Sequence, residues 1–245
     1  MVLTSLHRKD FKFSLLSQYM IVFDTPGPEN TSSIIDIVRK EAARCDFIVV
    51  ASITGTSALQ VAAVSPGKPI ICVTCPQGMN WEVDEMDRDL FATNPGLRSI
   101  RDEWRREGRT RVPMEITAEN RDQLNKLGIP VVKGTIPFFG PSFSIRLHLR
   151  QMTSLDIIAK TLELISPGTL VGLECVLMTT DAGVIQEGAR VLACAGTERG
   201  LDTAWIMRSA ASANLFHPEK GVRMIELLAK PGIAETPDVS IGYLR

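Results

Sequence analysis

The sequence predicts an α/β protein with parallel strands, and two stretches of the chain carry this prediction. Residues 47–51 form a short apolar run rich in β-branched side chains, which is typical of a buried strand. A hydroxyl-rich turn, an apolar helical segment at 58–64 and a second apolar strand at 69–74 follow. Strand, helix and strand in this order form a βαβ unit, whose right-handed crossover makes its two strands parallel. A second strand–turn–helix junction, at 21–44, repeats the pattern.

The turn inside the βαβ unit is the first candidate ligand site. It carries four hydroxyl side chains around one glycine: Ser52, Thr54, Gly55, Thr56 and Ser57. Free N–H groups and a partial positive charge at the start of a helix favour a bound phosphate, and Gly55 would let the backbone approach it. Serine and threonine before a helix are also ordinary N-caps. The residues alone leave phosphate binding and helix capping equally open.

The chain before this unit is expected to divide into an extension and the start of the domain. Met20 directly precedes the first convincing strand, at 21–23, so we expect residues 1–19 to be an N-terminal extension. A turn follows, and Asn30 or the next residue is expected to cap the helix that runs to residue 44.

Composition limits the classes of partner. The 245 residues are 44% hydrophobic and 22% charged, which is ordinary for a globular protein, and no apolar run is long enough to span a membrane. The formal net charge of −1 gives no reason to expect a nucleic acid. Five scattered cysteines indicate reduced thiols in a cytoplasmic protein. Two of them, Cys72 and Cys75, form a CxxC without a second pair for zinc, and we interpret them as structural.

The middle of the chain is expected to leave and then rejoin the sheet. Residues 79–113 are polar and charged and are interpreted as a surface insertion or lid with one short helix. A helix at 116–127 and a strand at 129–132 come next, and the strand ends at Lys133, Gly134 and Thr135.

Basic side chains mark the following segment, 138–150, which is expected to be irregular or extended. Arg146, His148 and Arg150 alternate with leucines, so in an extended chain all three would point to one face. That face could meet an anion or only water, and the residues leave both interpretations open.

Two carboxylates stand out in the apolar stretch that follows the helix at 153–165. Residues 170–182 are apolar nearly throughout, and their length and the glycine after them favour a helix. Glu174 and Asp181 interrupt this run, and a buried carboxylate needs a partner or a hydrogen-bonding ligand. Helix capping or an internal ion pair is the alternative to a ligand.

The last part of the chain is expected to close the sheet. Strands at 190–195 and 204–207 flank a polar loop that contains Gly196, Thr197 and Asp202. A short helix at 210–215 and a strand at 222–228 follow. We therefore expect a single α/β domain over residues 20–230 and a loose tail at 231–245.

Several motifs together resemble one family, the stand-alone prokaryotic proteins that have the fold of the pyruvate kinase carboxyl-terminal domain. The motifs are F-x-x-P-G-x-E-N-T at 23–31, V-V-A-S-x-T-G-x-[ST]-A at 49–58, T-x-x-[ED]-I-x-A-x-T-L at 153–162, E-x-x-x-M-x-x-D-A-G at 174–183 and G-T-x-x-G-x-D-T-A at 196–204. The resemblance implies a three-layer α/β/α sandwich with a mostly parallel sheet. It also implies a pocket between the 52–57 turn and the 196–203 loop, for which flavin mononucleotide (FMN) is a candidate occupant.

The chain departs from the family pattern near the expected ligand. Cys75-Pro76 stands where the family tends to have histidines, and the 79–113 segment is longer than expected. The glycine–arginine pair expected after Gly134 is not cleanly present, and Arg146 or His148 is the candidate substitute. The catalytic domains of pyruvate kinase are absent, so the resemblance implies no chemistry on phosphoenolpyruvate.

We therefore expect a binding protein for a phosphate-bearing small molecule, with FMN as the candidate cofactor. The alternatives are a flavin-dependent oxidoreductase, a phospho-compound hydrolase, or a structural subunit with a vestigial pocket. No catalytic residue or metal cluster can be assigned, and the sequence leaves open whether the chain forms a homo-oligomer. The expected ligand residues are Asn30, Ser52, Thr54, Gly55, Thr56, Ser57, Thr74, Gly134, Thr135, Glu174, Asp181, Gly196, Thr197 and Asp202.

Overall fold

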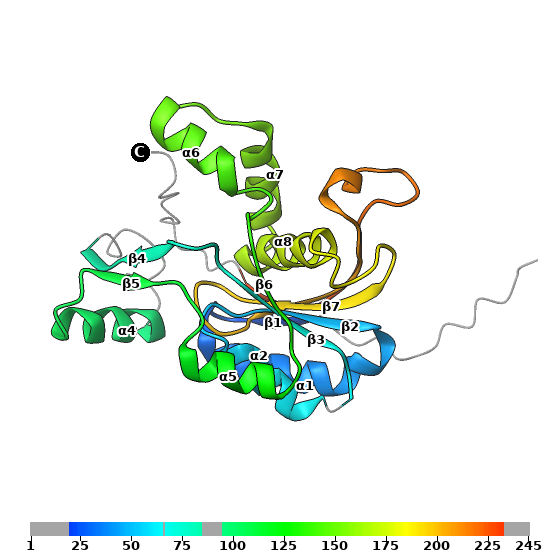
Figure 1. Cartoon of the computed structure of the whole chain (residues 1–245), viewed down its shortest axis with the longest axis horizontal. Helices are drawn as coiled ribbons and strands as arrows, with labels where there is room; N and C mark the ends of the chain where they lie inside the picture. Colours follow the sequence, from blue (N-terminus) through cyan, green and yellow to red (C-terminus); the bar gives the residue numbers. More distant parts are fainter. Residues whose placement is uncertain (1–19, 66, 85–94, 233–245) are drawn as a thin grey trace, which may run out of the picture.

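A mostly parallel sheet of seven strands forms the centre of the protein, as a computed structural model shows for residues 20–65, 67–84 and 95–232 (Figure 1). Its strand order is β1-β9-β8-β7-β2-β3-β6. The strands are β1 (Ile21–Phe23), β2 (Phe47–Ala51), β3 (Ile70–Thr74), β6 (Val131–Lys133), β7 (Arg190–Ala195), β8 (Thr203–Arg208) and β9 (Arg223–Pro231). β8 runs antiparallel to both of its neighbours, and the other pairings are parallel. The expected α/β class, the parallel βαβ unit and the pairing of β7 with β8 are confirmed.

Helices cover both faces of the sheet, so the architecture is consistent with a three-layer α/β fold (Figure 1). One face carries α1 (Thr31–Glu41), α2 (Thr56–Val64) and α5 (Ala118–Lys126), and the other carries α8 (Pro167–Asp181) with α7 (Ser154–Glu163) outside it. Alternate side chains of β2 pack into the two different helix layers. Ile48 and Val50 belong to the core with α1 and α2, whereas Val49 belongs to the core with α8.

The central helix of the second layer is the apolar run that the sequence marked as a helix. It begins at the cap Ser166, whose Oγ accepts a hydrogen bond from the Thr169 amide at 3.0 Å, with Pro167 in the first turn. It is apolar nearly all round because the sheet covers one side and α7 covers another. A Cβ on Gly168 would lie 2.3 Å from Thr203 Oγ1, so this glycine allows the helix to approach β8 closely.

The expected surface segment at 79–113 has structure of its own. β4 (Asn80–Glu82) pairs antiparallel with β5 (Arg111–Pro113), and α4 (Pro95–Arg106) lies beside them at one end of the molecule (Figure 1). Trp81, Trp104 and two valines form a small apolar cluster against Ile53, in the turn after β2. The segment therefore contacts the candidate ligand turn.

The expectation of an irregular or extended chain at 138–150 was wrong, because this segment contains the helix α6 (Gly140–Leu149). The Ser142 hydroxyl donates to the Phe138 carbonyl at 2.7 Å and fixes the first turn. Arg150 has a left-handed φ of 58° and ends the helix. In a helix, Arg146, His148 and Arg150 do not share one face, so the expected common basic face does not form.

The remaining elements are short 3-10 helices. The expected helix at 210–215 is only η4 (Ser212–Asn214), and η1 (Pro28–Asn30) and η2 (Ala42–Arg44) flank α1. β9 extends through Pro231, and the Gly232 amide donates to the Phe23 carbonyl at 2.6 Å, so the first two residues of the expected tail are held on the sheet. The predicted extension at 1–19 and the rest of the tail, 233–245, lie outside the described residues. In the described ranges, no helix combines the length and the apolar character needed to cross a membrane.

Candidate functional site

A cavity of about 300 Å³ opens at the carboxyl ends of β2, β3 and β7. Segments from far apart in the sequence form its wall: the turn after β2, the end of β3, the 79–114 segment, the start of α6, the inner sides of α7 and α8, and the loop after β7. Apolar side chains form much of this wall, among them Ile53, Trp81, Met114, Ile136, Phe138 and Met178. A cavity of this size, with a few polar groups on apolar walls, is suited to a small organic ligand.

The turn after β2 lines the cavity through Ser52, Thr54 and Ser57. Ser52 Oγ accepts hydrogen bonds from the amides of Ser57 at 3.1 Å and Ala58 at 3.4 Å, so it caps the helix from inside the fold. The Ser57 side chain is different. It is only 9% exposed, it lines the cavity, and no residue within the described part of the chain hydrogen-bonds its hydroxyl. The turn thus contains both a helix cap and a free hydroxyl that faces the cavity.

Gly55 and Thr56 lie on the other side of this turn, outside the cavity lining. Gly55 has a left-handed φ of 90°, and a Cβ there would lie 3.0 Å from the Cβ of Asn120 on α5. Thr56 Oγ1 lies 3.2 Å from Asn120 Nδ2 and 3.1 Å from Thr54 Oγ1. The glycine is therefore required by the backbone conformation and by α5, rather than by the close approach of a ligand.

The loop after β7 forms the neighbouring wall, because β7 and β2 are adjacent parallel strands. It lines the cavity with residues 196–200. Thr197 is 1% exposed, and its buried hydroxyl lies near the Asp202 carboxylate, whose pKa it helps to lower. Buried hydroxyls normally find a partner, so the Ser57 hydroxyl on the neighbouring turn is the donor available to a ligand.

Asp202 holds this loop in place from behind the cavity. Its Oδ2 accepts hydrogen bonds from the amides of Gly27 and Thr197, both at 3.0 Å, and its Oδ1 accepts one from the Thr203 hydroxyl at 2.8 Å. The side chain is fully buried, and burial raises its pKa, although the Thr203 and Thr197 hydroxyls and the amides of Gly27 and Thr197 oppose this shift. Asp202 therefore joins the loop after β1 to the loop after β7.

Arg199 places a positive charge in the same wall. Its guanidinium carbon lies 5.8 Å from the ring centroid of Trp81 and 5.5 Å from that of Trp104. Within the described ranges, no acceptor takes a hydrogen bond from this guanidinium, and burial lowers its pKa from the ordinary value. An arginine remains charged at neutral pH, so its donors are available for an anion in the cavity.

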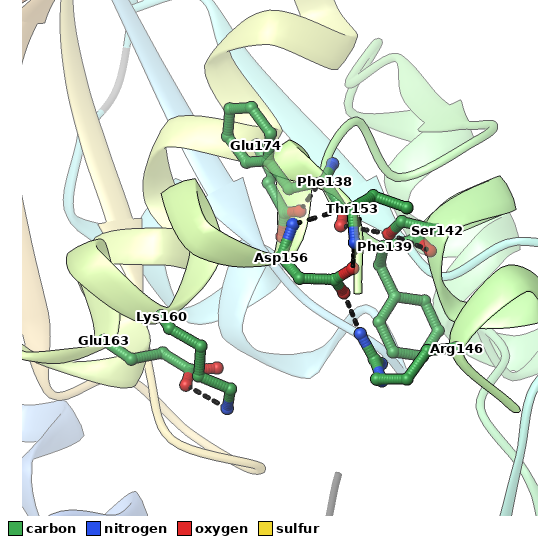
Figure 2. Close-up of polar contacts among 9 residues, drawn as sticks. All are labelled: Phe138, Phe139, Ser142, Arg146, Thr153, Asp156, Lys160, Glu163 and Glu174. Atoms are coloured by element: carbon green, nitrogen blue, oxygen red, sulfur yellow. Dashed lines mark hydrogen bonds and ion pairs between the residues drawn. The ribbon is translucent and has the colours of Figure 1, made fainter. Parts of the chain in front are cut away.

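Ion pairs balance the charges on the opposite wall (Figure 2). Arg146 on α6 pairs with Asp156 on α7, and Lys160 pairs with Glu163 at 2.6 Å. Asp156 also accepts hydrogen bonds from the Thr153 amide at 2.7 Å and hydroxyl at 2.8 Å, in a capping box. Burial raises the pKa of Asp156, but Thr153 and Arg146 outweigh it and hold this pKa below its ordinary value.

Glu174 is a buried carboxyl group in the apolar part of the wall (Figure 2). Its Oε1 accepts a hydrogen bond from the Phe138 amide at 3.1 Å. Burial raises its pKa to about 8; the Phe138 amide opposes this shift, and the charge of Glu163 adds to it. Glu174 is therefore mostly protonated at neutral pH and can donate a hydrogen bond.

The cavity brings together about half of the residues that the sequence predicted. Those in its lining are Ser52, Thr54, Ser57, Thr74, Glu174, Gly196 and Thr197. Those outside it are Asn30, Gly55, Thr56, Gly134, Thr135, Asp181 and Asp202. Asn30 Nδ2 donates to the Thr25 carbonyl at 2.7 Å, and Asp181 accepts from the Ser212 amide at 2.8 Å, so both have structural partners.

Three parts of the lining were missed by sequence reasoning. They are Arg199 with Trp81, which Trp104 backs from outside the lining, the two ion pairs on α6 and α7, and the aromatic side chains at the start of α6. Arg199 lies inside the glycine-bearing loop that the sequence marked, which was the available signal. No signal in the sequence marked the tryptophans, because about a hundred residues of chain separate them from Arg199.

Cys75 also lines the cavity, but not as a reactive thiolate. All five cysteines are free thiols, and burial, with the charge of Glu198 adding to it, raises the pKa of Cys75 to about 11. Its partner in the CxxC, Cys72, has its pKa raised by burial to about 12. Over the residues described here, no group of three or more metal-ligating side chains gathers at one place.

The fold and the cavity define an α/β protein with a cavity at the carboxyl edge of its parallel strands, the edge where open α/β sheets commonly bind ligands. A comparison of the chain with models of known protein families finds none that matches it. The resemblance to the pyruvate kinase carboxyl-terminal domain therefore stays a prediction from motifs.

Proposed function

We propose that this protein binds a small molecule that carries a phosphate group on an apolar body, with FMN as the candidate ligand. The observation that carries the proposal is the Ser57 hydroxyl, which lines the cavity without a hydrogen-bond partner among the described residues, next to the loop of the neighbouring strand β7 that carries Arg199. The amino end of α2 adds a partial positive charge at this point. The motif resemblance to the stand-alone relatives of the pyruvate kinase carboxyl-terminal domain supports the same ligand class.

The distribution of charge in the cavity supports an anion on this side. Asp156 and Glu163 are each paired with a cation, and Glu174 is mostly protonated at neutral pH. Arg199 lies next to the Thr197 loop with its guanidinium donors unused by the described residues. Glu198, whose Oε2 accepts from the Trp81 indole at 3.4 Å, opposes this charge. The positive charge of Arg199 and the Ser57 hydroxyl support a phosphate at this end of the cavity.

The apolar wall favours a ligand that is more than a phosphate ion. Phe138, Leu170 and Met178 line the wall that the start of α6 and the helix α8 form, together with other apolar residues. Burial of a flat organic body against them would contribute about 25 cal/mol for each Å² of apolar surface removed from water. A phosphate ester with such a body uses both ends of the cavity.

The test is a comparison of two neighbouring hydroxyls. Isothermal titration calorimetry with FMN and with inorganic phosphate should show that Ser57→Ala weakens both ligands by about 1.5–3 kcal/mol, as expected for the loss of a hydrogen bond to a charged group. Thr56→Ala is the matched control, because Thr56 lies outside the cavity and hydrogen-bonds Asn120. It should lower stability slightly and leave binding unchanged. Equal effects of the two substitutions on binding, or no binding of either ligand by the wild-type protein, would refute the proposal.

A further inference from the structure

The apolar end of the cavity contains one polar side chain whose chemistry the phosphate proposal does not use. Glu174 is 6% exposed and lines the cavity from the inner side of α8. Its Oε1 accepts the Phe138 amide at 3.1 Å, and none of the residues that the structure describes hydrogen-bonds Oε2. An oxygen that accepts an amide is the carbonyl oxygen of a neutral carboxyl group, so the proton resides on Oε2.

In the described part of the chain, the charged side chains near Glu174 are paired with one another. Lys160 and Glu163 face the cavity from α7 and pair with each other, and Asp156 pairs with Arg146 from α6 (Figure 2). Glu163 raises the pKa of Glu174 further, and the thiols of Cys75, after β3, and Cys175, beside it on α8, are protonated because burial raises their pKa. A carboxyl group in such surroundings is kept neutral at pH 7 and is a hydrogen-bond donor.

We propose that Glu174 donates a hydrogen bond from Oε2 to a neutral acceptor on the body of the ligand, such as a carbonyl oxygen or a ring nitrogen. This inference rests on the proposed function and narrows it: the ligand is a phosphate ester whose flat body carries a neutral hydrogen-bond acceptor.

The experiment measures FMN affinity by calorimetry at pH 7 and pH 9, where the phosphate keeps the same charge because its second pKa is about 6. With the pKa of Glu174 at about 8, its protonated fraction falls by roughly tenfold over this range, so wild-type affinity should fall about tenfold. Glu174→Gln keeps an amide donor at every pH and should bind FMN equally at both. Glu174→Leu should bind at least about tenfold more weakly at pH 7.

Two controls separate a role in binding from a role in folding. Asp181→Asn changes a carboxylate on the same helix that lies outside the cavity, and it should leave FMN affinity and its pH dependence unchanged. An infrared difference spectrum of wild type against Glu174→Gln should show a protonated carboxyl band at pH 7 that the variant lacks. Absence of that band would overturn the inference whatever ligand is used.

Inorganic phosphate and lumiflavin, a flavin ring without phosphate, test the two ends of the cavity separately. Phosphate binding that Ser57→Ala weakens, together with FMN binding that Glu174→Leu leaves intact, overturns this inference and keeps the proposed function. Lumiflavin binding that weakens in Glu174→Leu, without phosphate binding, supports the hydrogen bond from Glu174 but overturns the phosphate ester, and with it the proposed function. A wild-type protein that binds none of the three probes overturns both.

Discussion

Asn120 on α5 donates a hydrogen bond from its side-chain amide to the carbonyl oxygen of Thr54 at 2.9 Å. This bond links the outer layer of helices to the turn that lines the cavity, and the Thr117 amide donates to the same carbonyl at 3.4 Å. The turn is therefore held from the side opposite to the ligand, so its shape is fixed before any ligand binds. A preformed site loses less conformational entropy when a ligand enters it.

Gly55→Ala should destabilise the protein by about 1–3 kcal/mol, because the residue has a left-handed φ and its new Cβ would meet Asn120 at 3.0 Å. Chemical denaturation followed by circular dichroism measures the effect. Gly134→Ala is the matched control, since a Cβ there meets no atom within 4 Å and its backbone is not left-handed. Equal stability of the two variants would show that the turn tolerates a side chain at Gly55.

Arg199→Met should weaken phosphate binding by about 1.5–3 kcal/mol, because the substitution removes the charge and the donors from the phosphate end. Glu198→Gln should have the opposite effect and strengthen binding, since it removes the opposing carboxylate. Titrations at two salt concentrations should also show a weaker salt dependence for Arg199→Met than for wild type. Arg39→Met, which changes an exposed arginine paired with Asp36, should leave binding unchanged.

Asp202→Ala should lower the free energy of unfolding by several kcal/mol, because it leaves the buried amides of Gly27 and Thr197 without their acceptor. Each unsatisfied buried group costs about 1–3 kcal/mol. Asp36→Ala, which removes an exposed carboxylate, should cost less than about 1 kcal/mol. A thermal transition unchanged by Asp202→Ala would show that the two loops do not depend on this side chain.

Glu174 should make the protein more stable in mild acid than in mild alkali. Its pKa is about 8 in the folded protein and close to 4.5 when unfolded, so between these values only the folded state holds the proton. The contribution of Glu174 to the free energy of unfolding is full below pH 4.5. It falls by about 1.4 kcal/mol for each pH unit between pH 4.5 and about 8, and it is constant at higher pH. Glu174→Gln should remove this dependence, and denaturant titrations of both proteins from pH 5 to 9 would reveal it. Parallel stability curves for the two proteins would contradict the assignment.

The sheet was predictable because parallel strands buried on both faces have nearly continuous apolar sequences, as in β2 and β3. The structure of segment 138–150 was not predictable, because its basic residues alternate with leucines at the period of a strand. Its helix depends on tertiary contacts, including the pair of Arg146 with Asp156. The residue pattern within the segment contains no information about its contact with α7.

In the candidate site, too, the sequence identified single residues but not the contacts between distant parts of the chain. Glu174 and Asp181 looked alike as carboxylates in one apolar run, but seven residues of helix separate them by roughly 10 Å along the axis. One therefore lines the cavity, while the other meets Ser212 at the end of the helix. Arg199 and the tryptophans could be joined only by the structure, because nothing in the sequence places them together.

The cavity wall is assembled from both ends of the domain, from Ala51 near its start to Gly200 near its close. A ligand that fills the cavity must therefore bind the folded chain and not the unfolded one. Its affinity can be measured from the rise in the melting temperature of the protein. At a concentration one hundred times its dissociation constant, such a ligand adds about 2.7 kcal/mol to the free energy of unfolding. For a domain of this size that corresponds to a rise in melting temperature of roughly 5–10 °C. A melting-temperature screen over a collection of phosphate esters can thus search for the natural ligand without any assumption about the reaction, if any, that follows binding.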